Sequence, residues 1–139
     1  MRIAQWMKGP VESIGSHETV RRARTLLRQH RINQLPVVDN GRLVGILTER
    51  DLRAAFATTP ELPEELAERE GIPDPEHIPV ETVMTADVLT LGPDDTVEDA
   101  ARVMRRRRIG SIPIVEGKRV VGMLTRSDVI DAFLAGAGA

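Results

Sequence analysis

An internal repeat is the feature that most restricts how this chain can fold. Residues 44–52 read VGILTERDL, and residues 121–129 read VGMLTRSDV. An ungapped match with an offset of 77 positions runs from about residue 3 to 57 and again from about residue 80 to 134. Self-similarity of this length indicates two structural units built from one pattern of helices and strands.

The repeat predicts the domain organisation of the 139-residue chain. We place the first repeat in residues 1–57 and the second in residues 80–139. Residues 58–79 read TTPELPEELAEREGIPDPEHIP and fall outside the repeated pattern. Their prolines and glutamates are typical of a solvated linker.

Each repeat predicts the same order of elements. A short extended segment comes first, at 11–14 and 88–91. An amphipathic helix follows, because apolar residues recur at helical spacing after a threonine suited to an N-cap, Thr19 or Thr96. Two apolar β runs come next, separated by turn residues, and a second helix begins at Thr48 or Thr125.

This β-α-β-β-α pattern, present twice, predicts an α+β fold with a pseudo-twofold axis. Hydrophobic residues make up 41% of the chain and aromatic residues only 2%, so the core must consist of aliphatic side chains. Each repeat alone is too small to bury its sheet face well. We therefore expect the two repeats to pack sheet to sheet, with matching clefts between them.

Composition excludes several classes of function. The formal net charge of −2 argues against a nucleic-acid-binding protein. The chain has no cysteine, which excludes disulfides and Cys-based zinc sites. The start MRIAQWMKGP lacks the apolar run of a signal peptide, and no stretch has the roughly 20 apolar residues of a membrane helix. We expect a soluble cytoplasmic protein with no membrane partner.

The repeated Thr-x-x-Asp pairs, Thr48 with Asp51 and Thr125 with Asp128, have two interpretations. They are helix capping boxes, or they form part of a nucleotide site. Aspartate is shorter than the usual Glu or Gln partner of a capping box, which favours the second interpretation. A helix N-terminus suits a phosphate, and an adjacent carboxylate suits the two hydroxyls of a ribose.

The sequence resembles a pair of CBS domains, the regulatory repeat of the cystathionine-β-synthase type. The resemblance rests on VMTADVLTLGPDDTVEDAARVM and RRIGSIPIVEGKRVVGMLTRSDV, and on their counterparts MKGPVESIGSHETVRRARTLL and HRINQLPVVDNGRLVGILTERDL. It implies a duplicated β-α-β-β-α module with two clefts. It also implies adenine-containing ligands such as AMP, ADP, ATP or S-adenosylmethionine, and a homodimer.

The resemblance also implies roles for individual residues. Asp51 and Asp128 would hold ribose hydroxyls, with Thr48 and Thr125 at the ribose or phosphate. Arg50 and Arg126 are candidates for phosphate contact. Adenine would be lined by two segments from each repeat: Ser13, Ile14, Asn33, Gln34, Leu35 and Pro36 in the first, and Thr90, Leu91, Gly110, Ser111, Ile112 and Pro113 in the second.

We therefore expect a stand-alone, non-enzymatic regulatory module that senses an adenine nucleotide of the AMP/ADP/ATP class. The ligand would bind in the clefts between the repeats, require no cofactor, and signal to an unidentified regulated protein or through a dimer surface. The alternative is a ligand-free dimerisation module in which Thr-x-x-Asp only caps helices. The run Arg105–Arg108 suits a helix end, and secondly a phosphate, more than a nucleic acid.

Overall fold

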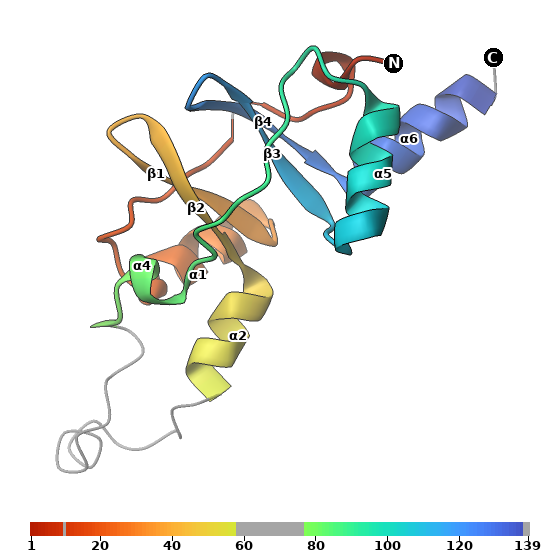
Figure 1. Ribbon diagram of the computed structural model, residues 1–139. Helices are drawn as coiled ribbons and strands as arrows, with labels where there is room; N and C mark the ends of the chain where they lie inside the picture. Colours follow the sequence, from red (N-terminus) through yellow and green to blue (C-terminus); the bar gives the residue numbers. More distant parts are fainter. Residues whose placement is uncertain (10, 58–76, 138–139) are drawn as a thin grey trace, which may run out of the picture. The chain divides into compact units, whose positions relative to one another are not determined.

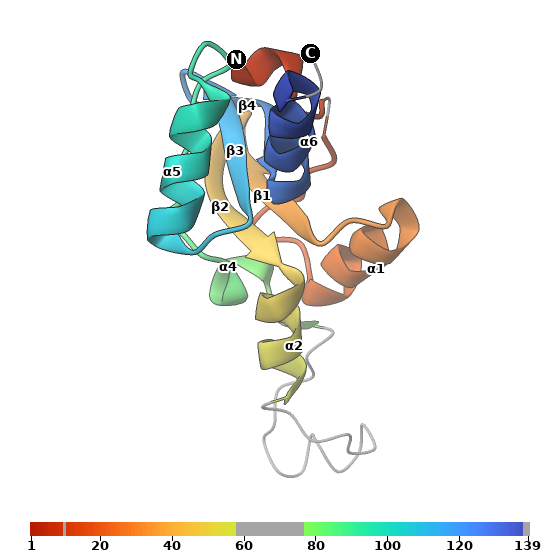
Figure 2. The same cartoon turned by 90° about the vertical axis from the view of Figure 1, so that its right-hand side faces the viewer.

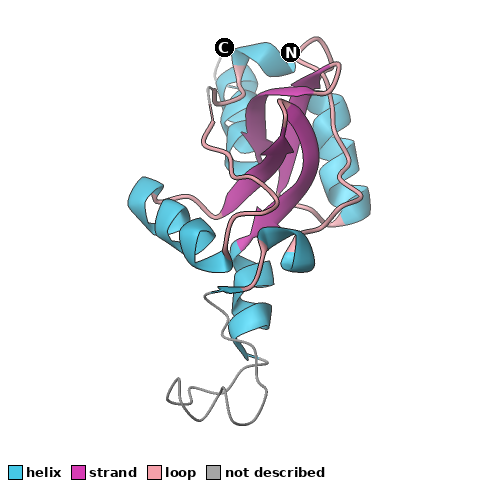
Figure 3. Ribbon diagram, turned by 90° about the vertical axis from the view of Figure 1, so that its left-hand side faces the viewer, coloured by secondary structure: helices cyan, strands magenta, loops and turns pink. Residues whose placement is uncertain are grey.

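The computed structural model describes residues 1–9, 11–57 and 77–137. Helices and strands occur together in it (Figure 3), which confirms the α+β class. The chain divides into two compact units. We call Glu12–Val88 the first unit, and Met1–Val11 together with Leu89–Ala139 the second unit.

Both units contain a hairpin and two longer helices, labelled in Figure 1. The first unit consists of α1 (Val20–His30), β1 (Gln34–Asp39), β2 (Arg42–Thr48), α2 (Glu49–Ala57) and the short α4 (Val80–Val83). The second consists of the 3-10 turn η1 (Ile3–Gln5), α5 (Val97–Arg107), β3 (Ser111–Glu116), β4 (Arg119–Thr125) and α6 (Arg126–Ala137). In the second unit, α5 and α6 flank the β3–β4 hairpin (Figure 2).

The first helix of each repeat begins as the sequence predicts. The Thr19 hydroxyl accepts a hydrogen bond from the Arg22 amide at 3.1 Å, and Thr96 accepts one from the Asp99 amide at the same distance. These N-caps satisfy amides that have no partner inside the helix. The apolar face of each helix is buried, and the last turns of both helices carry basic residues.

The two hairpins share one antiparallel register, because Gln34 pairs with Thr48 and Ser111 pairs with Thr125. Their turns differ. Asn40 and Gly41 both have positive φ, of 51° and 76°, which is the φ pattern of a type I′ turn. At the matching turn only Gly117 has positive φ, of 64°, as in type II′.

The extended segments predicted at 11–14 and 88–91 contribute less than a strand each. Ile14 forms a single parallel bridge with Val37, and Leu91 forms the matching bridge with Ile114. The other edge of each hairpin carries an antiparallel bridge that was not predicted from the sequence: Ile46 pairs with Thr85, and Met123 pairs with Lys8.

These bridges show that the repeats exchange their first segments. Ile3 comes from the first repeat in sequence, yet it is fully buried in the core of the second unit. Val80, its counterpart at the start of the second repeat, is fully buried in the core of the first unit. The packing units are therefore a different division of the chain from the sequence repeats, whose boundaries stay a prediction. Most of the predicted linker lies outside the described residues.

Candidate functional site

The hairpin register brings the segment before the first strand and the Thr-x-x-Asp pair of each repeat together at one end of the hairpin. The predicted residues Ile14 and Leu91 pair farther along the strand, with Val37 and Ile114. Gln34 lies opposite Thr48, and the Asn33 carbonyl accepts a hydrogen bond from the Glu49 amide at 2.8 Å. In the second unit the Gly110 carbonyl accepts one from the Arg126 amide at 2.9 Å. The segment before the first strand is thus bonded to the start of the following helix in both units.

In the first unit, Thr48 and Asp51 form a complete capping box. The Asp51 amide donates to Oγ1 of Thr48 at 3.1 Å, and the Thr48 amide donates to Oδ2 of Asp51 at 2.9 Å. Aspartate is therefore long enough to reach back, and the sequence argument against a capping box is wrong on this point. We call Thr48–Asp51, with the N-terminus of α2, the Asp51 site.

The equivalent Asp128 site, Thr125–Asp128 with the N-terminus of α6, has the same geometry and one bond more. The Thr125 amide donates to Oδ2 of Asp128 at 2.8 Å, and the Thr125 hydroxyl donates to the same oxygen at 2.9 Å. The Asp128 amide donates to Oγ1 of Thr125 at 3.3 Å. In both sites the capping box uses Oδ2 and leaves the second carboxylate oxygen, Oδ1, for another donor.

The two sites differ in what reaches this second oxygen. Nζ of Lys8 lies 3.3 Å from Oδ1 of Asp128. The position that matches Lys8 in the repeat is Thr85, and within the described ranges no cation pairs with Asp51. Asp128 is buried, with a relative exposure of 3%, whereas Asp51 is only half-buried. The Asp51 carboxylate is therefore the more accessible of the two.

The structure restricts what the remaining predicted site residues can offer a ligand. Leu35 and Ile112 are fully buried in the two cores, so neither residue presents a surface to a bound molecule. Pro36 and Pro113 are buried as well, whereas Ser13, Asn33, Gly110, Arg50 and Arg126 are exposed. Intermediate positions are occupied by Gln34, Thr90, Leu91 and Ser111, and Ile14 is buried.

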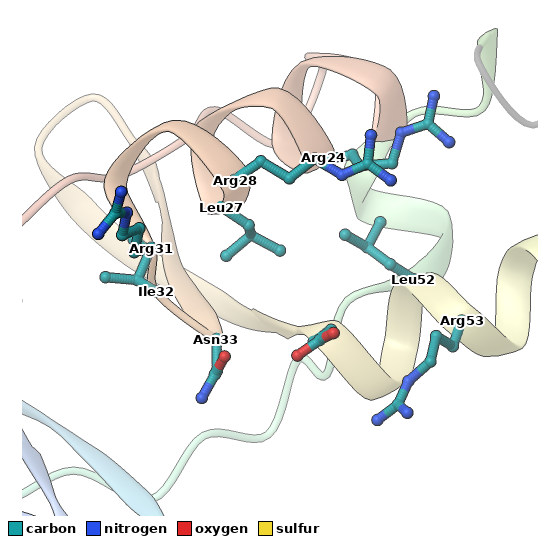
Figure 4. Close-up of a pocket in the computed structure, with 9 residues that line it drawn as sticks. Arg24, Leu27, Arg28, Arg31, Ile32, Asn33, Leu52 and Arg53 are labelled. Atoms are coloured by element: carbon teal, nitrogen blue, oxygen red, sulfur yellow. The ribbon is translucent and has the colours of Figure 1, made fainter.

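A groove of about 830 Å³ lies beside the Asp51 site, between α1 and α2. Leu27 and Leu52 point toward each other across it, and arginine side chains surround it (Figure 4). Asn33 and Glu49, which are bonded to each other through their backbones, also line the groove. The arginines lining it are Arg24, Arg28, Arg31 and Arg53.

The second unit has a smaller groove of about 330 Å³ at the matching place, between α5 and α6. Arg105 and Arg108 line it in place of Arg28 and Arg31, and Arg126 replaces Glu49. Arg105–Arg108 were candidates for phosphate contact from the sequence, whereas the groove-lining arginines of α1 were not predicted. Their spacing, at positions 24, 28 and 31, was the available signal, because residues three and four apart share one helix face.

A hairpin flanked by two helices, duplicated with a Thr-x-x-Asp pair at the start of the second helix, defines the class of CBS domain pairs. Comparison with known protein families agrees, because the CBS domain family matches residues 3–58 and 80–135. This chain belongs to the CBS domain family, as the sequence resemblance indicated.

Three relatives illustrate this membership. A CBS domain-containing protein of Dictyostelium discoideum is 35% identical over 134 residues, which are 95% of this chain and 90% of the relative. The solved CBS pair of protein MJ0100, in complex with 5′-methylthioadenosine and S-adenosyl-L-methionine, is 29% identical with a TM-score of 0.79, and the match covers 96% of this chain and 99% of that one. CBSX2 in complex with AMP is 25% identical with a TM-score of 0.80, and 98% of each chain is covered.

Two further findings concern other kinds of site. Among the residues that the structure describes, no group of three or more His, Cys, Asp or Glu side chains could hold a metal ion. Over the same residues, the structure contains no helix with the length and apolar character needed to cross a membrane.

Proposed function

We propose that this chain is a regulatory module that binds an adenine nucleotide of the AMP/ADP/ATP class and catalyses no reaction. The observation that carries the proposal is the second carboxylate oxygen of Asp51, which pairs with no cation among the residues that the structure describes. Its Oδ2 completes a helix cap, and its Oδ1 remains for a ligand beside the N-terminus of α2. The complexes of MJ0100 with adenosine derivatives and of CBSX2 with AMP support this choice of ligand.

In the proposed binding mode, different groups of the protein bind the ribose, the adenine and the phosphates. Oδ1 of Asp51 accepts hydrogen bonds from the ribose hydroxyls, as a carboxylate can accept from two adjacent donors. The adenine lies along the segment before β1, where Ser13 and Asn33 are exposed. The phosphates lie near the N-terminus of α2 and the arginines of the adjoining groove, where the helix dipole and the guanidinium groups favour negative charge.

Binding would act on the protein by shifting the populations of its conformations. A ligand can shift such an equilibrium only by the difference in its affinity for the two states. We propose that the shifted state is read by a second copy of the chain or by a regulated protein of unidentified kind.

Thermal unfolding with AMP, ADP, ATP and S-adenosyl-L-methionine tests the proposal. A ligand at 100 times its dissociation constant stabilises a protein by about 2.7 kcal/mol, which raises the Tm by several degrees in a domain of this size. We expect such a shift with at least one nucleotide in the wild type. We expect the double variant Asp51→Asn, Asp128→Asn to lose most of it.

The choice of asparagine separates the two interpretations of the Thr-x-x-Asp pair. Asparagine keeps an oxygen that accepts the Thr48 or Thr125 amide, so the helix caps survive. It loses the negative charge and the second acceptor oxygen that the ribose would use. A nucleotide shift of unchanged size in the double variant would show that the carboxylates do not bind ligand. No shift with any nucleotide in the wild type would contradict the proposed function.

The second candidate is a dimerisation module in which the pairs act only as caps. One observation favours self-association in either case. Helix α6 exposes three large apolar side chains, with relative exposures of 51% for Ile130, 44% for Phe133 and 65% for Leu134. Their spacing places them on one helical face, and exposed apolar faces of this kind are common at protein–protein contacts. We propose a homodimer that uses this face of α6.

A further inference from the structure

Lys8 and Thr85 occupy equivalent places in the two units, which makes their chemical difference informative. The amide and carbonyl of Lys8 both bond to Met123 on β4, at 2.9 Å in each direction. Thr85 forms the same pair of bonds with Ile46 on β2, also at 2.9 Å. Each residue therefore lies on the hairpin edge, two strand positions from the threonine that begins the Thr-x-x-Asp pair.

The long side chain of Lys8 reaches the one atom of the Asp128 site that the capping box leaves free. Its Nζ lies 3.3 Å from Oδ1 of Asp128, whose side chain is 4% exposed, while the Lys8 side chain is 72% exposed. An ammonium ion that stays largely in water thus neutralises a carboxylate that is almost fully buried. A threonine is too short to do the same, and no described cation pairs with Asp51.

We propose that Lys8 makes Asp128 the weaker of the two adenine-nucleotide sites, so that the Asp51 site fills first. This inference rests on the proposed function. Ribose hydroxyls must share Oδ1 of Asp128 with the ammonium group or displace it. At Asp51 they meet an oxygen that pairs with no cation in the part of the chain that the structure describes.

The size of the effect follows from the strength of the competing contact. Exposed ion pairs are weak, but an ion pair whose carboxylate is buried is less screened by solvent and salt. We therefore expect the affinities of the two sites to differ by about fivefold to tenfold. A two-step response of this kind would extend the range of nucleotide concentrations over which the module reports.

Exchanging the two residues tests the proposal directly. The variant Lys8→Thr gives the second unit the residue of the first, and Thr85→Lys makes the opposite change. Binding is followed by NMR through the amides of Thr48 and Thr125, since each donates to the carboxylate of its own site. AMP and adenosine serve as probes, because only AMP carries a phosphate.

The proposal predicts that the Thr48 amide responds at lower ligand concentration than the Thr125 amide in the wild type. Lys8→Thr should strengthen binding at Asp128 by about fivefold for AMP and for adenosine alike, because the competing donor is gone. Thr85→Lys should weaken binding at Asp51 by a similar factor. Asp51→Asn and Asp128→Asn confirm which amide reports which site.

Other outcomes overturn the proposal in distinguishable ways. Equal affinities at the two wild-type sites, or a stronger Asp128 site, would refute the order of filling while leaving the proposed function intact. Weaker AMP binding in Lys8→Thr with unchanged adenosine binding would show that Lys8 is a phosphate ligand and not a competitor. No response of either amide to AMP, adenosine, ADP or ATP would refute the proposed function and this inference together.

Discussion

The grooves beside the two Thr-x-x-Asp pairs have the same framework and different linings. In the first unit, Arg24 and Arg53 lie at positions that Ala101 and Ile130 occupy in the repeat of the second. Glu49 is replaced by Arg126 at the start of the second helix, and the groove volume falls from about 830 to about 330 Å³. The cores, in contrast, hold apolar residues at matching positions, which are identical at Leu47 and Leu124 and differ by one methylene group at Val37 and Ile114.

This contrast shows which positions the fold constrains. Buried residues must remain apolar and close in volume in both units, because a protein interior tolerates little change in volume. Residues around the carboxylates face solvent and can differ without loss of packing. The two units therefore keep one structure while presenting two different sites.

The largest predicted effect is a loss of stability on substitution of a glycine that both units share. Gly45 and Gly122 lie where the exchanged segment crosses each hairpin. A Cβ at Gly45 would lie 2.6 Å from Sδ of Met84 and 2.9 Å from the Thr85 carbonyl oxygen, and at Gly122 it would lie 2.8 and 2.9 Å from the matching atoms of Met7 and Lys8. We expect Gly45→Ala and Gly122→Ala each to lower the free energy of unfolding by about 2–3 kcal/mol.

Urea unfolding at equilibrium measures both changes. The methionine side chains can move, but the carbonyl oxygens belong to the backbone bridges, so the cost should be similar in the two units. Gly136→Ala in α6 is the control, since a Cβ there meets no atom within 4 Å and alanine favours a helix by up to about 1 kcal/mol. A loss below about 1 kcal/mol in either hairpin variant would show that the exchanged segment yields easily.

A second prediction concerns the exposed apolar face of α6, which includes Ile130 where the matching position of α2 is Arg53. Leu134→Glu should weaken self-association by about thirtyfold, or about 2 kcal/mol, because it places a charge in the proposed apolar contact. Sedimentation velocity over a range of concentrations measures this. Ala135→Glu is the matched control, since Ala135 is exposed on α6 outside the apolar stripe. A wild type that sediments only as a monomer would refute the dimer.

Local patterns made much of this fold predictable from the sequence. The helix faces, the N-caps at Thr19 and Thr96 and the turn between β1 and β2 depend on residues a few positions apart, and all are confirmed. The position of Thr48 and Thr125 at the start of a helix is confirmed for the same reason. The family membership followed because many such patterns recur in one order.

The features that were missed depend on contacts between distant parts of the chain. The side chain of Ile3 packs in the core of the second unit, and its amide donates a hydrogen bond to the Asp95 carbonyl at 2.9 Å. No local pattern in the sequence indicates this partner. The pairing of Lys8 with Asp128 follows from that exchange of segments, so it could not be predicted either. Charge positions at a site are set by tertiary structure, whereas caps and turns are set by neighbours.

The smallest effect concerns a contact that only the first unit has. Ser16 donates to Asp39 from its hydroxyl and from its amide, and these two bonds, in that order of importance, lower the pKa of the Asp39 carboxyl below 3.8. Because the folded-state pKa is lowered, the resulting stability is present above the ordinary pKa and is lost as the pH falls through the folded value. Ser16→Ala should therefore raise the pKa of Asp39 toward 3.8, as measured by NMR titration of its carboxyl carbon. The variant should be less stable than the wild type near neutral pH, and the difference should shrink at acidic pH.

Pro93 and Glu116 occupy the matching positions of the second unit, so Glu116→Gln is the control that should leave the pH dependence unchanged. A stability difference between Ser16→Ala and the wild type that stays constant from neutral to acidic pH would show that the hydroxyl acts through packing and not through the charge of Asp39.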